Sequence, residues 1–204
     1  MILKHITCWV GAKVSDVPET ALIATPRGLV RGRCKSIVGG LLNFARKNQV
    51  KYNQTDLIEL MRISVSSIII PKNVRYTLKN DLSNPLAEID LEQMIQVITN
   101  LLKNAVEAMP SGGALRATLS NSFDWVIISI RDEGMGIDTA DLEKVFEPFY
   151  TTKGIGKGTG LGLATTYGIV KMHRGQIDVK SNNLREKGPT GTEFIIKLPR
   201  KREL

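Results

Sequence analysis

The sequence predicts an α+β fold, a two-layer α/β sandwich in which helices cover one face of a mixed, mostly antiparallel sheet. The order of elements after residue 50 reads as helix, strand, helix, two strands, a loop region, helix and two strands. Consecutive strands in this order need only hairpin connections, which favours antiparallel pairing. The order disfavours a doubly wound parallel sheet, in which strands and helices alternate throughout.

The N-terminal quarter is predicted to be separate from the main domain, with a boundary between residues 1–52 and 53–204. Residues 1–26 contain two prolines and no sustained periodicity, so we expect irregular structure there. Residues 34–48 are predicted to form a helix, since one apolar stripe runs among basic residues: Ile37, Val38, Leu41, Leu42 and Ala45.

Two helices and a strand are predicted next. A helix over residues 55–68 begins at Thr55, a residue type that caps helices well. A strand is expected at 74–81. The strongest helical pattern starts at Asp90, which we expect to cap it, and ends at the Pro-Ser-Gly-Gly sequence of residues 110–113.

The C-terminal half supplies most of the predicted sheet. Two alternating segments at 114–122 and 124–134 flank a turn and are predicted strands. A helix is expected from Leu161 to Gly175. Two further strands, 176–182 and 192–199, close the chain.

Composition and charge indicate a soluble cytoplasmic protein without a nucleic-acid-binding surface. The 204 residues are 42% hydrophobic, and no apolar run approaches the roughly 18 residues of a membrane helix. The two cysteines lack metal-ligand spacing and fit free thiols of a reducing cytosol. The net charge of +8 is concentrated at residues 27–51 and 197–203, so the body of the chain is not basic.

A glycine-rich segment, "GIGKGTGLGL" at residues 154–163, predicts a phosphate-binding loop. Its five alternating glycines would expose backbone N–H groups, and Lys153 and Lys157 add positive charge. The segment leads directly into a helix, whose N-terminus favours an anion. A flexible linker is the alternative. The spacing of a Walker loop is not present.

Two other motifs carry candidate ligand groups. "DEGMGI" at residues 132–137 puts Asp132 at the end of an apolar strand, where its carboxylate can accept from an exocyclic amine, although a plain turn is the alternative. "NLLKN" puts Asn100 and Asn104 on one helix face. Amide oxygens suit Mg²⁺, which keeps waters and substrate phosphates as its other ligands, although solvated asparagines remain the alternative.

The order of these motifs resembles the ATP-binding domain of sensor histidine kinases of the nitrogen-regulation type. "NLLKN", "DEGMGI", "FEPFYTTK" and "GKGTGLGL" are similar to the four ordered boxes of this GHKL superfamily, whose fold is the Bergerat fold, and "GTEFIIKLP" is similar to its last strand. The resemblance covers about residues 54–199. Upstream, "IVGGLLNFAR" resembles the second helix of the family's dimerisation and phosphotransfer hairpin, which implies a homodimer through that helix.

The resemblance implies ATP and Mg²⁺ as cofactors and gives each motif a role. Asn104 would bind Mg²⁺, and Asn100 would lie beside it; both are the implied catalytic residues. Asp132 would recognise adenine, and Phe146 and Phe149 would anchor a lid. The remaining implied nucleotide-binding residues are Gly134, Gly136, Ile137, Lys153, Lys157, Gly158, Thr159, Gly160, Leu161, Gly162 and Thr192. The implied reaction moves the γ-phosphoryl group to a histidine on another segment or chain, and the implied partner is a response regulator or a histidine-bearing protein.

Two departures keep alternatives open. Residue 107 is Glu, where many relatives carry Lys, and neither His5 nor His173 matches the family's phosphoacceptor box. An ATPase, a serine kinase or a regulatory module without turnover are therefore the alternatives. The hydrolytic branches resemble one another in placing Glu where this chain has Asn100, and an amide cannot act as a general base. Asn100 therefore favours the histidine kinase.

Overall fold

The computed structural model describes residues 50–153, 158–184, 186 and 188–201. The predicted helix at 34–48 and the irregular residues 1–26 lie outside the described residues. The described elements are β1 (Asn53–Asp56), α2 (Leu57–Ser66), β2 (Val74–Asn80), β3 (Leu86–Ile89), α3 (Leu91–Ala108), β4 (Gly113–Ser122), β5 (Trp125–Asp132), α4 (Gly162–Met172), β6 (Gln176–Asn182) and β7 (Gly191–Pro199).

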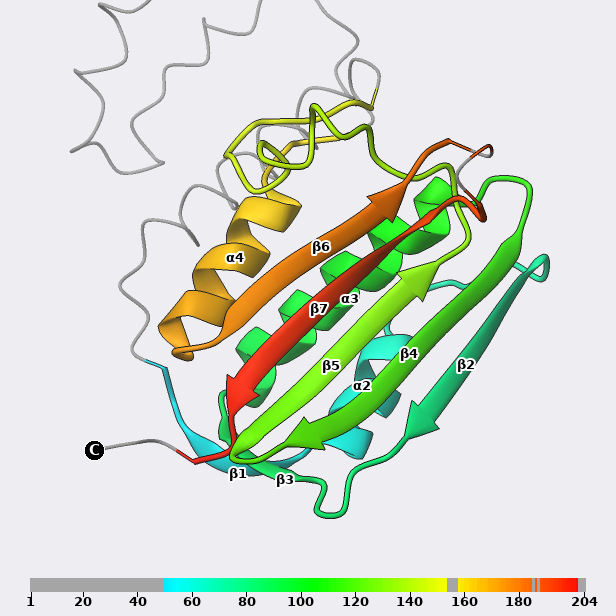
Figure 1. Cartoon of the computed structure of the whole chain (residues 1–204). Coiled ribbons are helices and arrows are strands. Elements are labelled where there is room, and N and C mark those ends of the chain that lie inside the picture. Colours follow the sequence, from blue (N-terminus) through cyan, green and yellow to red (C-terminus); the bar gives the residue numbers. More distant parts are fainter. Residues whose placement is uncertain (1–49, 154–157, 185, 187, 202–204) are drawn as a thin grey trace, which may run out of the picture. The chain divides into compact units, whose positions relative to one another are not determined.

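The main sheet has the strand order β2-β4-β5-β7-β6, with β2 and β4 parallel and every other pair antiparallel. This is the mixed, mostly antiparallel sheet that the order of elements predicts. Figure 1 shows the sheet in front and α2, α3 and α4 behind it. The chain between β5 and β7 contains α4 and the edge strand β6. Because β5 and β7 are antiparallel neighbours, the end of β5 lies beside the start of β7.

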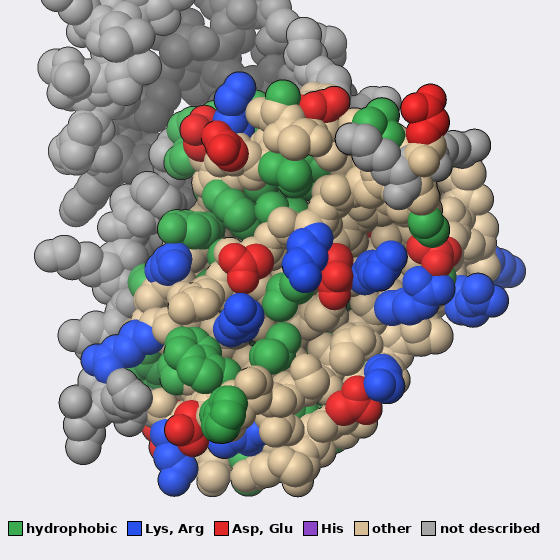
Figure 2. Space-filling view, viewed as in Figure 1, with side chains coloured by type: hydrophobic (Ala, Val, Ile, Leu, Met, Phe, Trp, Pro, Cys, Tyr) green, Lys and Arg blue, Asp and Glu red, His purple; other side chains and the backbone are tan. Residues whose placement is uncertain are grey.

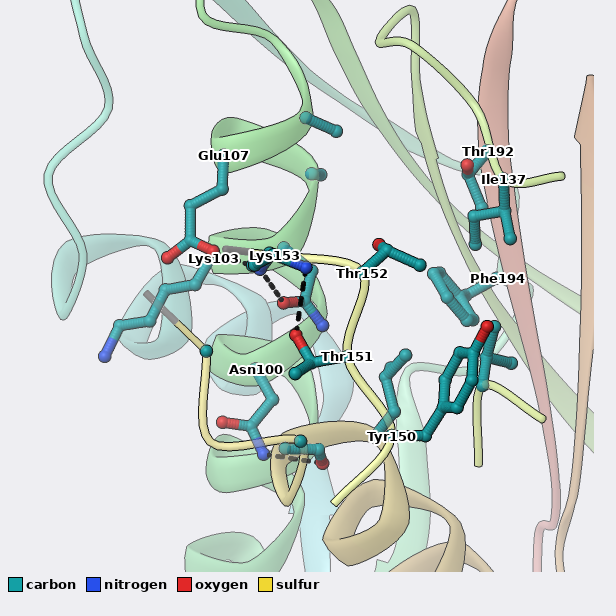
Figure 3. Close-up of a pocket in the computed structure, with 18 of the residues that line it drawn as sticks. Asn100, Lys103, Glu107, Ile137, Tyr150, Thr151, Thr152, Lys153, Thr192 and Phe194 are labelled. Carbon is teal, nitrogen blue, oxygen red and sulfur yellow. Dashed lines mark hydrogen bonds and ion pairs between the residues drawn. The ribbon is translucent and has the colours of Figure 1, made fainter. Parts of the chain in front are cut away.

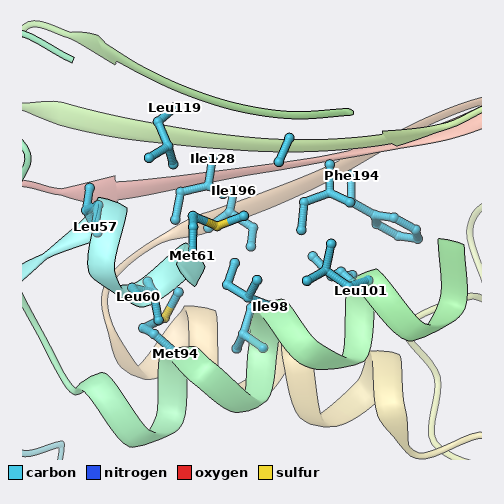
Figure 4. Packing of buried hydrophobic residues seen from close by; sticks show 14 of the residues in the cluster. Leu57, Leu60, Met61, Met94, Ile98, Leu101, Leu119, Ile128, Phe194 and Ile196 are labelled. Carbon is cyan, nitrogen blue, oxygen red and sulfur yellow. The ribbon is translucent and has the colours of Figure 1, made fainter. Parts of the chain in front are cut away.

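The core lies between the helices and one face of the sheet. The helices contribute fully buried side chains: Leu60 from α2, and Met94 and Ile98 from α3. These pack toward strand residues such as Ile128 and Ile196 (Figure 4). Each buried side chain of this size stabilises the fold by about 1.5–3 kcal/mol relative to exposure. This packing fixes α3 along the sheet, so residues on its uncovered side keep a constant position relative to β5 and β7.

The opposite face of the sheet carries charged side chains of both signs, with hydrophobic side chains among them (Figure 2). Figure 2 shows Lys and Arg side chains interspersed with Asp and Glu over the strands. Arg116 on β4 pairs with Glu133 at 2.7 Å, and Ser129 on β5 donates to Glu193 on β7 at 2.6 Å. Neighbouring strands of the uncovered face are thus linked by polar side-chain contacts. Within the described part of the chain, no helix is long and apolar enough to cross a membrane.

Two local features differ from the sequence prediction. The cap of α2 is Asp56, whose Oδ1 accepts from the backbone N–H groups of Ile58 and Glu59, and Thr55 is instead buried in β1. Strands β1 and β3 were not predicted, and they form a separate antiparallel pair. Each has four residues, which is too short for an alternation of apolar side chains to stand out.

His173 joins the end of α4 to the start of α3. Its side chain is 1% exposed, and its Nε2 accepts from the backbone N–H of Asp90 at 3.1 Å. The proton is therefore on Nδ1, which donates to the carbonyl of Ile169 at 2.8 Å. Burial lowers the pKa of His173, so the neutral imidazole is favoured. This is the structural role that a histidine at a helix end suggests.

Candidate nucleotide-binding site

One cavity of about 890 Å³ brings most of the predicted site residues together between α3, the adjoining ends of β5 and β7, and the segment before α4. Figure 3 shows side chains from these elements facing one another across it. The predicted residues that line it are Asn100, Asn104, Asp132, Gly136, Ile137, Lys153, Gly158, Thr159, Gly160, Gly162 and Thr192.

Two of the described predicted residues, Gly134 and Leu161, do not line the cavity. Both are buried and adjoin lining residues in the sequence, and Leu161 is 6% exposed. Lys157 lies outside the described residues. Leu161 directly precedes the first residue of α4.

The sequence prediction missed several lining residues. On α3, Lys103 and Glu107 follow the helical spacing that already joins Asn100 to Asn104 and could have been found from it. Others come from the segment before α4, inside the motif "FEPFYTTK", or from the β7 core face: Tyr150, Thr151, Thr152 and Phe194. Phe194 gave no separate signal, because an apolar residue of a strand is expected in the core.

Asp132 forms one end of the cavity. Its carboxyl group is buried, and Oδ1 accepts from the backbone N–H of Gly134 at 2.8 Å and of Thr192 at 3.2 Å. Burial raises the pKa of Asp132, while these two hydrogen bonds and the charge of Arg131 oppose the shift. The carboxyl group is thus fixed through one oxygen, and its other oxygen remains to meet a ligand.

Ser181 on β6 supports the same end of the cavity. Its hydroxyl accepts from the backbone N–H of Ile137 at 2.8 Å and donates to the carbonyl of Gly191 at 2.9 Å. It also lies 2.9 Å from the hydroxyl of Thr192, its direct cross-strand neighbour. One hydroxyl therefore ties together β6, β7 and the loop after β5.

The glycines of the loop after β5 are required by close packing against the protein. A Cβ at Gly134 would lie 2.6 Å from the carbonyl oxygen of Ala108 on α3, and one at Gly136 would lie 2.2 Å from that of Asn182. Gly136 also has φ +75°, which favours glycine. The closeness of the neighbouring backbone therefore requires glycine at both positions.

The two asparagines of α3 have different partners. Asn100 donates through Nδ2 to the carbonyl of Gly162 at 3.2 Å, which ties α3 to the first turn of α4. Asn104 turns its Oδ1 into the cavity, where it accepts from the ammonium group of Lys153 at 3.1 Å. The oxygen of Asn104 therefore already faces a cation.

Lys153 also forms an ion pair with Glu107, one turn along α3 from Asn104. Their side chains are 37% and 52% exposed, so the pair contributes little to stability. Figure 3 shows Lys153 reaching from the segment before α4 toward Glu107 on α3. The Glu that departs from the family pattern thus pairs with Lys153, a residue that the resemblance implies in nucleotide binding.

The segment before α4 is closed at its base by backbone contacts. The N–H of Phe149 donates to the carbonyl of Gly160 at 2.8 Å, with φ +69° at Phe149 and +65° at Gly160. Phe146 packs at 5.4 Å between ring centroids against Tyr167 of α4. Phe149, the other residue expected to anchor this segment, is 56% exposed. Its backbone forms the anchor.

The first turn of α4 faces the end of the cavity opposite Asp132. No side chain caps this helix, and its first turn has no acidic residue. The first N–H groups of an α-helix have no partner within the helix, and they carry the positive end of its dipole. With Lys153 nearby, this end of the cavity favours a polyanion.

A family model supports the same reading of the chain. The family described as "Histidine kinase-, DNA gyrase B-, and HSP90-like ATPase" matches residues 89–202, more than half of the chain. The chain belongs to this family. The matched range includes every residue that lines the cavity, so the cavity lies within the matched ATPase domain.

Individual histidine kinases support this assignment. Sporulation kinase E of Bacillus subtilis (strain 168) is 37% identical over 171 residues, which are 82% of this chain but 22% of that kinase. The nucleotide-free catalytic domain of histidine kinase ThkA has a TM-score of 0.64 at 29% identity and covers 74% of this chain and 97% of that one. ThkA in complex with response regulator protein TrrA has a TM-score of 0.68 at 26% identity, covering 84% and 48%. These relatives confirm the predicted fold and family.

Proposed function

We propose that this chain is the ATP-binding catalytic part of a sensor histidine kinase, which transfers the γ-phosphoryl group of Mg-ATP to a histidine on another segment or chain. One observation carries the proposal: the two ends of a single cavity differ in chemistry. One end presents the buried carboxyl group of Asp132, and the other presents the uncapped start of α4 with Lys153. An amine-bearing base joined to a polyphosphate matches both ends.

Mg²⁺ fits the residues on the phosphate side. Among the described residues, no cluster of three or more His, Cys, Asp or Glu side chains could hold a metal ion. The oxygen of Asn104, which accepts from the Lys153 ammonium, is the ligand we assign to Mg²⁺. Such a site suits a metal ion that takes its other ligands from water and phosphate. When bound, Mg²⁺ would neutralise charge on the β- and γ-phosphates.

The proposed steps of this chain's residues are binding and orientation. Asp132 accepts from the base, and the first turn of α4, Gly158 and Lys153 hold the phosphates. Asn100 fixes that turn through the Gly162 carbonyl. A neutral imidazole already has a lone pair for attack on the phosphorus, so the transfer needs no carboxylate base at residue 100. This favours a histidine acceptor over water.

The acceptor is proposed to lie on another segment or chain. The sequence has two histidines, and the side chain of His173 is buried with both ring nitrogens in hydrogen bonds. A response regulator is the proposed downstream partner, since the related ThkA forms a complex with one. A homodimer through the N-terminal helix and a cytoplasmic location complete the proposal. A nucleotide-binding module without turnover is the alternative.

Calorimetric titration with ATP, with and without Mg²⁺, tests the proposal. We expect binding in both conditions and tighter binding with Mg²⁺. The variant Asn104→Ala should bind ATP equally with and without the metal ion, and Asn73→Ala, on the loop before β2, is the control that should keep the Mg²⁺ effect. Absence of ATP binding by the wild type would overturn the proposal.

A further inference from the structure

We propose that Ser181 is a positioning residue for base specificity. Its hydroxyl accepts the hydrogen of the Thr192 hydroxyl, so that Thr192 can only accept a hydrogen bond from a ligand. The site therefore selects a purine with an amino group rather than an oxo group at position 6. The inference rests on the proposed nucleotide-binding function. It concerns a residue that does not line the cavity and acts through one that does.

The argument starts from the single hydrogen of a serine hydroxyl. Ser181 donates that hydrogen to the carbonyl of Gly191 at 2.9 Å. A serine hydroxyl has one donor and two lone pairs, so Ser181 has nothing left to donate to Thr192. In the contact of 2.9 Å between the two hydroxyls, Thr192 must therefore be the donor. Its own lone pairs remain, so it can offer a ligand only an acceptor.

Four backbone donors around this end of the cavity are also in use. The N–H groups of Gly134 and Thr192 donate to Asp132, and that of Ile137 donates to Ser181. The N–H of Met135 donates to the carbonyl of Ala108 at 3.2 Å. These four groups and the Thr192 hydroxyl therefore donate to the protein. On Asp132 and Thr192, the groups left for the ligand are the second oxygen of Asp132 and the Thr192 hydroxyl oxygen, both acceptors.

Two acceptors distinguish the two kinds of purine. The 6-amino group of adenine donates hydrogen bonds, whereas a 6-oxo group only accepts them. An oxo group placed here would meet two oxygens without a proton between them, and an unpaired buried acceptor is costly. Removing the Ser181 hydroxyl would free Thr192 to rotate and donate, which would relieve this conflict. Ser181 thus controls the choice through the direction of one hydrogen bond.

The test compares the affinities for ATP and inosine triphosphate, whose base carries a 6-oxo group. The wild type should prefer ATP, and Ser181→Ala should lower the ATP-to-inosine-triphosphate affinity ratio by about tenfold, with inosine triphosphate binding improved. Ser181→Thr keeps the hydroxyl and should restore the ratio. Ser129→Ala, which removes a serine hydroxyl bond on the other face of the sheet, should leave the ratio unchanged.

A double variant separates positioning from general damage. With Thr192→Val in place, no hydroxyl remains for Ser181 to direct, so adding Ser181→Ala should not change the ratio further. An unchanged ratio in Ser181→Ala, an equal loss for both nucleotides, or the same change in the Thr192→Val background would each overturn the inference. A wild type that binds neither nucleotide would instead overturn the proposed function.

Discussion

Asp132 and His173 are the two buried ionisable side chains on which the site and its support depend most directly. Both are fixed by backbone hydrogen bonds, and burial disfavours the charged form of each. The direction of the pKa shift is opposite: upward for the carboxyl group and downward for the imidazole. Each therefore leads to its own measurable consequence.

Asp132→Asn should weaken ATP binding by about 1.5–3 kcal/mol. An asparagine can keep its oxygen toward the N–H groups of Gly134 and Thr192, which turns its amide nitrogen toward the ligand. A donor would then face the adenine amine. Asp178→Asn, on β6 with its partner Lys197 at 3.7 Å, is the control and should bind as the wild type. Equal ATP affinity in Asp132→Asn and the control would remove Asp132 from the site.

Acidification below neutral pH should destabilise the fold through His173. The pKa of His173 is lowered from 6.5, so between the folded and unfolded pKa values the unfolded chain binds more protons. The contribution of His173 to the free energy of unfolding is fully present above about pH 6.5. It is lost as the pH falls through the pKa of His173 in the folded chain. Urea unfolding of the wild type and of His173→Gln measures it. A pH dependence that is the same in both proteins would show that His173 does not titrate in this way.

At the scale of elements, the base of the segment before α4 should be intolerant of a side chain at residue 160. A Cβ on Gly160 would lie 2.3 Å from the carbonyl carbon of Phe149, and its φ of +65° is unfavourable for alanine. Gly160→Ala should therefore open the Phe149–Gly160 contact and weaken ATP binding at least several-fold.

Gly168→Ala is the matched control for that variant. Gly168 lies within α4, where an added Cβ would meet no atom within 4 Å. Alanine there should raise the free energy of unfolding by about 0.5–1 kcal/mol with ATP affinity unchanged. If both glycine variants bound ATP like the wild type, the backbone contact at Gly160 would not shape the site.

The contact between α3 and the segment before α4 should restrain ATP binding. Lys153 must leave Glu107, and its contact with Asn104 must change, if Asn104 is to bind Mg²⁺. Glu107→Gln should therefore raise ATP affinity about two- to fivefold, the range of a surface ion pair, with little change in stability. Lys153→Met should lower the affinity. Calorimetry measures the ATP affinity of both variants. If the affinity rose in both or fell in both, Glu107 and Lys153 would not act in opposite directions on ATP binding.

At the scale of the whole molecule, the fold could be predicted because its long elements carry strong periodic patterns. The helix after Asp90 and the strands of the C-terminal half keep one buried face throughout. Short elements were missed for the same reason, since β1 and β3 have too few residues to show a period. Adjacent Thr55 and Asp56 are both good caps, and only the burial of Thr55 in β1 decides between them.

The site was predictable where a motif is contiguous and less so where distant segments meet. The order of the motifs was enough to gather Asn104, Asp132 and the glycine-rich loop. The contacts of Ser181 depend on the register of β6 against β7, and the pair of Lys153 with Glu107 spans 46 residues. No local pattern in the sequence encodes such pairings. The same holds for Gly134 and Gly136, whose neighbours come from α3 and β6.

The central claim is that one cavity binds a base at Asp132 and a polyphosphate at the start of α4. Backbone amide NMR during separate titrations with adenosine, inorganic tripolyphosphate and Mg-ATP tests it most directly. Adenosine should shift the resonances of Ile137 and Thr192, tripolyphosphate those of Gly162 and Leu163, and Mg-ATP both sets. Shifts outside these two groups, or adenosine and tripolyphosphate acting on the same residues, would contradict the claim.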